Sequence, residues 1–247
     1  ELASAGGDGK IRIWNVDSGK KIRTLKCNSD GVLAVAYRPD GAELASAGAD
    51  GRIQIWNAES GKKIRTLKCN SEEVLAVAYR PDGAELASAG TDGKIRIWNA
   101  GSDKPIRILL GHPDVVLGVA YRPDGTELAS AGADGRIQIW NAESAKPICT
   151  LPRHPEEVWG VAYRPDRVEL ASAGADGAVR TWNADTGTNP KRRNGIGRLL
   201  KDVWPTIVLI VGAGVLFVVL VCLGDGAVWT WSLHAHSDAS PLNEMSE

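Results

Sequence analysis

The sequence is poor in cysteine, and its cysteines lack the spacing of a metal site or of a disulfide framework. Of the four cysteines, Cys27 and Cys69 occupy one position of a repeat, whereas Cys149 and Cys222 are isolated. No Cys-x-x-Cys pair occurs. Zinc sites and small secreted domains are normally recognised by such spacings. We therefore expect no cofactor and no disulfide framework, and we expect a reducing, cytoplasmic compartment.

Catalytic motifs and an excess of charge are also missing. The chain has no phosphate-binding loop of the Gly-x-x-x-x-Gly-Lys type, no kinase catalytic loop and no nucleophile paired with a base. It has 29 Lys and Arg against 30 Asp and Glu, a formal net charge of -1. So balanced a composition provides no long-range field to attract nucleic acid. We expect a noncatalytic protein with no nucleic-acid partner.

A unit of 42 residues recurs five times. The hexamer Glu-Leu-Ala-Ser-Ala-Gly begins at Glu1, Glu43, Glu85, Glu127 and Glu169. An Asp-Gly pair follows in every unit, and six residues after its Asp comes a Trp-Asn pair, at Trp14, Trp56, Trp98, Trp140 and Trp182. A constant period of this length indicates a repeat architecture.

Each unit reads as four short strands, as the segment Gly111–Leu151 illustrates. The predicted strands are residues 115–121, 127–132, 136–140 and 147–151. Pro123 and Gly125 favour a turn between the first two, because proline presets φ and glycine accepts positive φ. The third strand alternates polar and apolar residues with the period of a strand. Four strands per unit of about 40 to 45 residues are typical of a propeller blade.

At these residues the chain resembles the WD-repeat β-propeller family, over roughly residues 1–183. The resemblance implies an all-β fold whose blades have four antiparallel strands. It also implies a hydrogen-bonded tetrad of His, Ser or Thr, Asp and Trp in each blade. Two units match this tetrad in full, with His112, Ser130, Asp134 and Trp140 in one and His154, Ser172, Asp176 and Trp182 in the other. We therefore interpret both histidines as structural rather than as catalytic residues or metal ligands.

Two other units depart from the family's tetrad. They have Asn28 and Asn70 at the histidine position. An amide donates a hydrogen bond but cannot reproduce the imidazole ring, so these networks are expected to be weaker. The family's Trp-Asp ending is Trp-Asn in all five units, which removes a charge and keeps an acceptor.

The repeats predict a propeller domain over residues 1–188 whose first unit lacks its innermost strand. A propeller normally closes by lending a strand from one terminus to the other, which removes the exposed edge. The ring is therefore expected to be incomplete in this chain. Three explanations stay open: the chain is a fragment, further repeats complete the ring, or self-association with another copy completes it.

The composition changes after Trp182. Residues 189–202 form a basic linker or an outer strand, and residues 203–224 then run for 22 residues without a charge. Such a run is long enough for a transmembrane helix of about 20 residues. No Lys or Arg occurs from Asp202 onward, so the positive-inside asymmetry would hold the propeller on the cytoplasmic side of a membrane, with residues 225–247 as a tail beyond it.

The same segment has an alternative interpretation as a degenerate sixth blade that extends to residue 232. Residues 225–231 match residues 176–182 at six of seven positions, and buried strands can be continuously apolar. Val203 and Val221 would then stand at the histidine and serine positions, so this blade would have no tetrad. The helix is favoured because it alone explains the missing positive charge.

The candidate partner-binding site is the entrance to the central channel. The family resemblance implies that a residue near the start of each innermost strand points to the top face. In this sequence these residues are Leu33, Leu75, Leu117 and Trp159, with Glu73 and Glu157 close by. An apolar ring with an acidic edge suits a protein or peptide segment, since exposed apolar patches mark interaction sites and Trp is enriched at hot spots. The alternative is that the leucines only pack against one another around a narrow channel.

Two functions remain open from the sequence. The favoured one is a noncatalytic scaffold that presents its top face to a protein or peptide partner and is tethered to a membrane if residues 203–224 span it. The other is a regulatory or sensory propeller from a larger multidomain protein, for example one that carries a kinase.

Overall fold

The structure is a computed structural model that describes residues 1–27, 31–69, 71–99, 101–165, 169–184, 206–209 and 218–221. In these residues every regular element is a β-strand. The strands form separate antiparallel sheets, and the three middle sheets have four strands each. The all-β fold class and the four-stranded blades expected from the sequence are therefore confirmed.

Five sheets follow one another along the chain as blades 1 to 5. Blade 1 contains β1 (Leu2–Ala5), β2 (Lys10–Trp14) and β3 (Lys21–Lys26). Blade 2 contains β4 (Val32–Tyr37), β5 (Glu43–Gly48), β6 (Arg52–Asn57) and β7 (Lys63–Lys68). Blade 3 contains β8 (Val74–Tyr79), β9 (Glu85–Gly90), β10 (Lys94–Asn99) and β11 (Pro105–Leu110).

Blade 4 contains β12 (Val116–Tyr121), β13 (Glu127–Gly132), β14 (Ile137–Asn141) and β15 (Pro147–Leu151). Blade 5 contains β16 (Val158–Tyr163), β17 (Glu169–Gly174) and β18 (Val179–Asn183). Each strand pairs with its neighbours in chain order, so every blade is an up-and-down meander.

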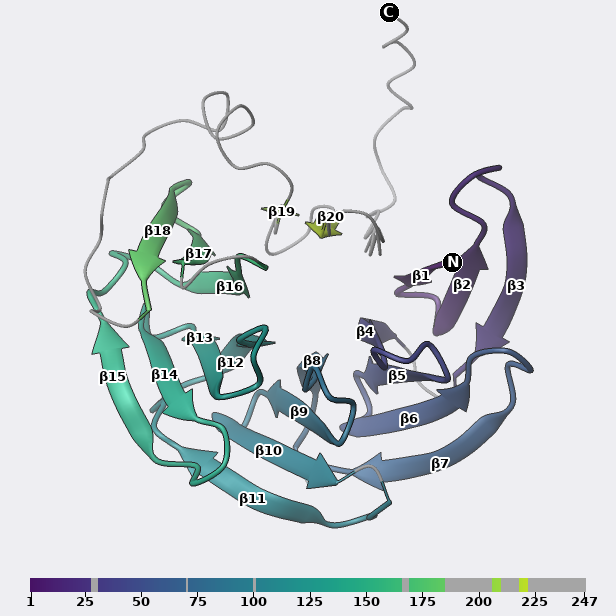
Figure 1. The fold of residues 1–247 in the computed structure, drawn as a ribbon, viewed down its shortest axis with the longest axis horizontal. Coiled ribbons are helices and arrows are strands. Elements are labelled where there is room, and N and C mark those ends of the chain that lie inside the picture. The colour runs from purple at the N-terminus through teal and green to yellow at the C-terminus, as the bar shows by residue number, and fades with distance from the viewer. Residues whose placement is uncertain are drawn as a thin grey trace, which may run out of the picture.

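The blades are arranged as an open arc around a common centre (Figure 1). Strands β4, β8, β12 and β16 lie innermost, and β3, β7, β11 and β15 lie on the circumference (Figure 1). Blade 1 and blade 5 stand at the two ends of the arc. The strand β1 corresponds in sequence to β5, the second strand of blade 2, so the first sheet begins one strand further from the centre than its neighbours do.

The Asp-Gly pairs form the turns between the second and third strands. In blade 2, the amide of Gly51 donates to the carbonyl of Gly48 at 3.2 Å, and Asp50 accepts the amide of Arg52 at 3.2 Å. Gly51 has a φ of +70°, and a Cβ there would meet the carbonyl oxygen of Ser71. Glycine is required here both by the backbone conformation and by the close approach of the next loop.

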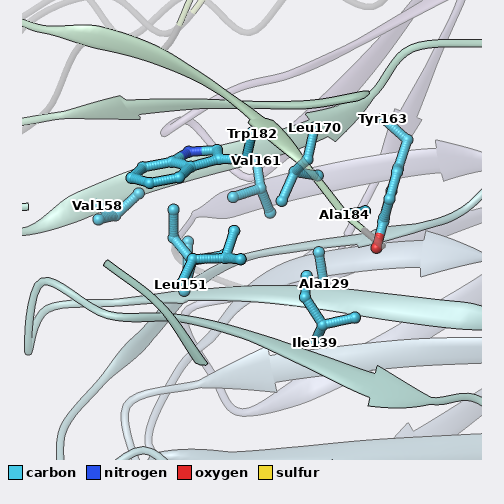
Figure 2. Packing of buried hydrophobic residues seen from close by; sticks show 11 residues of the cluster. Ala129, Ile139, Leu151, Val158, Val161, Tyr163, Leu170, Trp182 and Ala184 are labelled. Carbon is cyan, nitrogen blue, oxygen red and sulfur yellow. The ribbon is translucent and has the colours of Figure 1, made fainter. Parts of the chain in front are cut away.

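The hydrophobic core lies between the faces of neighbouring blades. Between blades 4 and 5, Ala129, Ile139 and Leu151 face Val158, Val161 and Trp182 (Figure 2). Equivalent clusters join blades 1 and 2, blades 2 and 3, and blades 3 and 4. The alanines of the repeated Glu-Leu-Ala-Ser-Ala-Gly strand are small, which leaves room for the tryptophan of the next blade. Burial of apolar surface between successive repeats is the main stabilising contribution in such architectures.

The described part of the C-terminal region is a pair of short strands. Strand β19 (Thr206–Leu209) pairs antiparallel with β20 (Val218–Val221), and β19 contacts β16 and β17 of blade 5. No helix among the described residues is long and apolar enough to cross a membrane. The basic linker, the other residues of the apolar segment, the tail and the predicted domain boundary at 188 lie outside the described residues. Both interpretations of residues 203–224 therefore remain predictions.

Because the core is built between blades, truncating one side chain there should destabilise the whole arc. Leu128 in β13 is fully buried in the cluster that joins blades 3 and 4. We expect Leu128→Ala to cost about 2–5 kcal/mol in unfolding free energy, measured by urea denaturation. The control is Ile148→Ala in the outer strand of the same blade, where the side chain is 50% exposed and the cost should stay under about 0.5 kcal/mol. Equal shifts for both variants would contradict this account of the core.

Candidate functional site at the channel entrance

A β-bulge lies near the start of every innermost strand. In β12 the residue Val116 is opposite Gly132, but Gly118 is opposite Ala131, so Leu117 has no partner of its own. The same shift occurs in β4, β8 and β16. The unpaired residues are Leu33, Leu75, Leu117 and Trp159. These are the four channel-entrance residues named from the sequence, and a bulge is a device that turns a side chain away from the sheet.

The bulge separates a buried residue from an accessible one. Val32, Val74, Val116 and Val158, which open the four strands, are at most 1% exposed. The residue after each valine is partly exposed in all four blades. The valines therefore anchor the inner strands in the core, while the leucines and Trp159 occupy equivalent positions of four strands that lie side by side around the centre (Figure 1).

Backbone hydrogen bonds hold the segment just before each inner strand. The carbonyls of Gly31, Val115 and Glu157 accept the amides of Ala49, Ala133 and Ala175 at 2.8–3.0 Å. In blade 3 the carbonyl of Glu73 accepts from Thr91 at 3.3 Å. These hydrogen bonds involve only main-chain atoms. The backbone before each inner strand is therefore held in the same way whichever side chain is present.

The inner strands of blades 4 and 5 approach each other closely. A Cβ added at Gly118 would lie 3.0 Å from the Cα of Gly160 and 3.2 Å from the carbonyl oxygen of Trp159. The glycine pair allows β12 and β16 to approach closely, whereas blades 2 and 3 have Ala34 and Ala76 at this position. Trp159 is therefore the residue next to a close contact of two inner strands.

The acidic residues of the site differ in how they are held. Glu157 is exposed, and one of its carboxylate oxygens lies 3.4 Å from the indole nitrogen of Trp159, which donates to it. Glu73 is partly exposed, and its own amide donates to the hydroxyl of Thr91 at 3.2 Å. Glu72 and Glu156 are exposed in the same two loops, and Asp114 is exposed in the equivalent loop before β12. These loops consequently have more acidic than basic side chains, although Arg153 is exposed in the same loop as Glu156 and Glu157.

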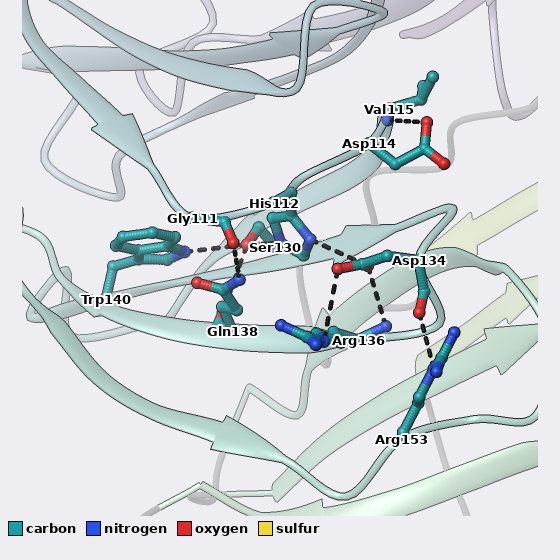
Figure 3. Close-up of polar contacts among 10 residues, drawn as sticks. All are labelled: Gly111, His112, Asp114, Val115, Ser130, Asp134, Arg136, Gln138, Trp140 and Arg153. Atoms are coloured by element: carbon teal, nitrogen blue, oxygen red, sulfur yellow. Dashed lines mark hydrogen bonds and ion pairs between the residues drawn. The ribbon is translucent and has the colours of Figure 1, made fainter.

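The tetrad of blade 4 is assembled as the family pattern implies (Figure 3). His112 Nδ1 lies 3.1 Å from Asp134 Oδ1, and His112 Nε2 lies 2.8 Å from Ser130 Oγ. Trp140 Nε1 donates to the same hydroxyl at 2.9 Å. A carboxylate only accepts, so Nδ1 carries the proton of the neutral ring and Nε2 accepts from Ser130. Burial lowers the pKa of His112 below its ordinary value, and the bond to Asp134 offsets only part of that effect.

In blade 5 an arginine joins the tetrad. Arg180 binds Asp176 at 2.6 Å and also donates to Nδ1 of His154, whereas Nδ1 is 3.5 Å from Asp176. The ring proton therefore sits on Nε2, which donates to Ser172 Oγ at 2.8 Å. Burial and the nearby Arg180 lower the pKa of His154. Both histidines have both ring nitrogens engaged in contacts within the blade.

In blades 2 and 3 the tetrad serine has a cysteine neighbour that was not predicted from the sequence. Asn28 and Asn70 lie outside the described residues, but the cysteine before each one is well placed. Cys27 Sγ lies 3.9 Å from Ser46 Oγ, and the buried Cys69 lies beside the equivalent Ser88 of blade 3. Burial raises the pKa of each thiol to about 11. With pKa values this high, the thiol of the half-buried Cys27 and the thiol of the buried Cys69 stay protonated beside the tetrad serines.

Blade 3 also has an arginine paired with its tetrad aspartate. Arg96 is 7% exposed and forms a bidentate ion pair with Asp92, at 2.5 and 3.2 Å. Burial alone would raise the pKa of Asp92, but hydrogen bonds from Arg96 and the backbone outweigh it, and the pKa lies below its ordinary value. The same Asp–Arg spacing recurs in blades 1 and 5, while Gln54 and Gln138 take the arginine position in blades 2 and 4.

A family model described as WD domain, G-beta repeat matches residues 19–57, 61–99, 103–141 and 145–183, together more than half of the chain. The chain belongs to the WD-repeat family. Each WD-repeat match spans the outer strand of one blade and the three inner strands of the next, so every repeat links two neighbouring blades. No curated protein matches the chain.

WD-repeat domains are generally noncatalytic and typically serve as protein-interaction scaffolds. Within the part of the chain that the structure describes, no three His, Cys, Asp or Glu side chains gather in a way that could hold a metal ion. The residues named from the sequence thus separate into two groups. The tetrads lie between strands inside the blades, and the four bulge residues with Glu73 and Glu157 lie at the ends of the inner strands.

The geometry of blade 4 predicts a measurable cost for the loss of its carboxylate. Asp134→Ala leaves the buried Nδ1–H of His112 without an acceptor and should destabilise the protein by about 1–3 kcal/mol. The control is Glu143→Ala, an exposed residue in the turn after β14. Thermal unfolding would measure both variants, and an unchanged melting temperature for Asp134→Ala would show that this network does not stabilise the blade.

Proposed function

We propose that this WD-repeat protein is a noncatalytic scaffold that binds an extended protein or peptide segment at the channel entrance, with Trp159 as the main anchor. The observation that carries the proposal is the position of Trp159. Blade tryptophans Trp56, Trp98, Trp140 and Trp182 are at most 5% exposed and are bonded to a serine. Trp159 instead stands at a bulge, partly exposed, and its indole is bonded to an exposed carboxylate.

The residue at the bulge differs between blades, which supports a surface that is selective for its partner. Three of the four bulge positions have leucine, and blade 5 alone has tryptophan. The larger side chain is not part of the core between blades 4 and 5, because the cluster there includes its neighbours Val158 and Val161 but not Trp159. An aromatic side chain offers a large contact area with few rotatable bonds, which is why tryptophan is common in binding hot spots.

The chemistry of the partner follows from the charges around the ring. The leucines provide an apolar surface in the middle, while Glu73, Glu157 and the exposed acids of the same loops lie beside it. A segment with an apolar side chain for the ring and a flanking Lys or Arg for the carboxylates would match both features. The rim charges would contribute mainly to the association rate, and Trp159 would contribute most of the affinity.

The test compares Trp159→Ala with wild type on an array of immobilised peptides that vary in apolar and basic residues. For the peptides that wild type binds best, we expect the variant to lose about 2 kcal/mol or more of binding energy, roughly thirtyfold in affinity. Trp159→Phe should retain part of the affinity, because the ring is kept. Melting temperatures should stay close to wild type, since no core cavity is created.

The matched control is Ile64→Ala, which removes an exposed apolar side chain, 48% exposed, from the circumference instead of the entrance. It should bind as wild type does. If Trp159→Ala binds every peptide as well as wild type, the entrance is not the binding site. If the variant fails to fold, Trp159 belongs to the core and the leucine ring only packs around the channel.

A further inference from the structure

The outer strand of a blade is an unpaired edge. Strand β11 pairs with β10 on one side only, and no other described strand lies outside it (Figure 1). Such an edge presents a row of free backbone amides and carbonyls and can pair with another strand unless it is protected. Lysine, proline and short length are the usual protections.

The exposed aliphatic residues of the described chain concentrate on these outer strands, and β11 has three of them. Ile106, Ile108 and Leu110 are 45%, 49% and 69% exposed. They alternate along the strand, so all three lie on one face of the sheet. At the positions of Ile108 and Leu110, strand β3 has Thr24 and Lys26 and strand β7 has Thr66 and Lys68. The same fold position is therefore polar in blades 1 and 2 and apolar in blade 3.

Pairing of β11 with the β11 strand of a second copy would place apolar side chains opposite apolar side chains. If two copies of this strand pair antiparallel about Ile108, each Ile106 lies opposite Leu110 of the other copy. The charged residue of the strand, Arg107, is on the other face and is already bound to Glu85 at 2.5 Å. No unpaired charge is then carried into the contact, which is the condition for burying such an edge without an electrostatic cost.

The equivalent pairing is disfavoured for the other described outer strands. In β7 it would place Lys68 opposite Ile64 of the second copy, and in β3 it would place Lys26 opposite Ile22. In β15 it would place Ile148 opposite Pro152, which has no backbone donor. Lysine and proline thus disfavour self-pairing of these three edges. In β11 the proline is Pro105, which opens the strand and would lie opposite Gly111, outside the Ile106–Leu110 pairing.

We propose that a second copy of this chain docks on β11, forming a two-fold symmetric dimer in which two four-stranded blades join into one continuous sheet. The contact is isologous, so one surface patch serves both copies. Each copy contributes one strand edge and three side chains. The buried area is therefore expected to be smaller than the roughly 800 Å² per partner of a standard interface. We expect a weak dimer with a Kd on the order of 100 μM.

The main experiment is sedimentation velocity of the full chain over about a hundredfold range of concentration around that Kd. The variant I108T/L110K gives blade 3 the residues that blades 1 and 2 already have, so it should fold normally, as melting temperature would show. Its Kd should rise at least tenfold. The control I22T/I64T removes two exposed isoleucines from β3 and β7 and should dimerise as wild type does.

A cysteine cross-link tests the register itself. Residues directly opposite in an antiparallel pair have Cβ atoms about 4.5–5.5 Å apart, so Ile108→Cys should form a disulfide with its own copy under mild oxidation. Ile64→Cys, equally exposed on β7, should not cross-link above the wild-type background.

Three results would overturn the proposal. Wild type could sediment as a monomer over the whole range. Alternatively, I108T/L110K could dimerise as strongly as wild type, which would place the contact on another surface, such as the blade ends that the ring-completion hypothesis requires. Finally, Ile64→Cys could cross-link as readily as Ile108→Cys.

Discussion

The hydrogen bond from a tryptophan indole to a serine hydroxyl is the interaction on which the rest of this structure depends. It occurs in all five blades, with distances of 2.8–2.9 Å. The bond joins the third strand to the second, and it sets the indole against the small alanines of the preceding blade. The second neighbour of the serine varies, from histidine in blades 4 and 5 to cysteine in blades 2 and 3, but the indole contact does not.

The channel entrance follows from this constraint. Once the second and third strands are locked, the inner strand can pair with the second strand only in one register, with a valine buried at its start. The same bulge follows the valine in all four blades. The valine side chain packs in the core, and the residues after the bulge pair with the second strand. The residue at the bulge neither packs in the core nor pairs with the second strand, so its side chain can be selected for binding. Leucine occurs there three times and tryptophan once.

Much of the fold could be predicted from the sequence, because the 42-residue period, the Asp-Gly turns and the Trp-Asn pairs repeat without change. The finer chemistry could not. Asn28 and Asn70 drew attention to the histidine position, and the preceding residues Cys27 and Cys69 were not predicted to lie beside the serine. The role of Arg180 depends on a side chain that crosses between Asp176 and the ring of His154, which spacing alone does not show. The bulge is equally invisible in the sequence, since Leu33 and its equivalents look like ordinary members of an apolar strand.

Hydrogen exchange of the tryptophan indole N–H groups, followed by NMR, tests the central claim most directly. In this account the blade tryptophans are buried and bonded to serine, whereas Trp159 is not. The indole protons of Trp56, Trp98, Trp140 and Trp182 should then exchange slowly, at a rate limited by opening of the fold. The indole proton of Trp159 should exchange much faster, because it is bonded only to an exposed carboxylate. Similar protection of Trp159 and the four blade tryptophans, or rapid exchange at Trp140, would contradict the account.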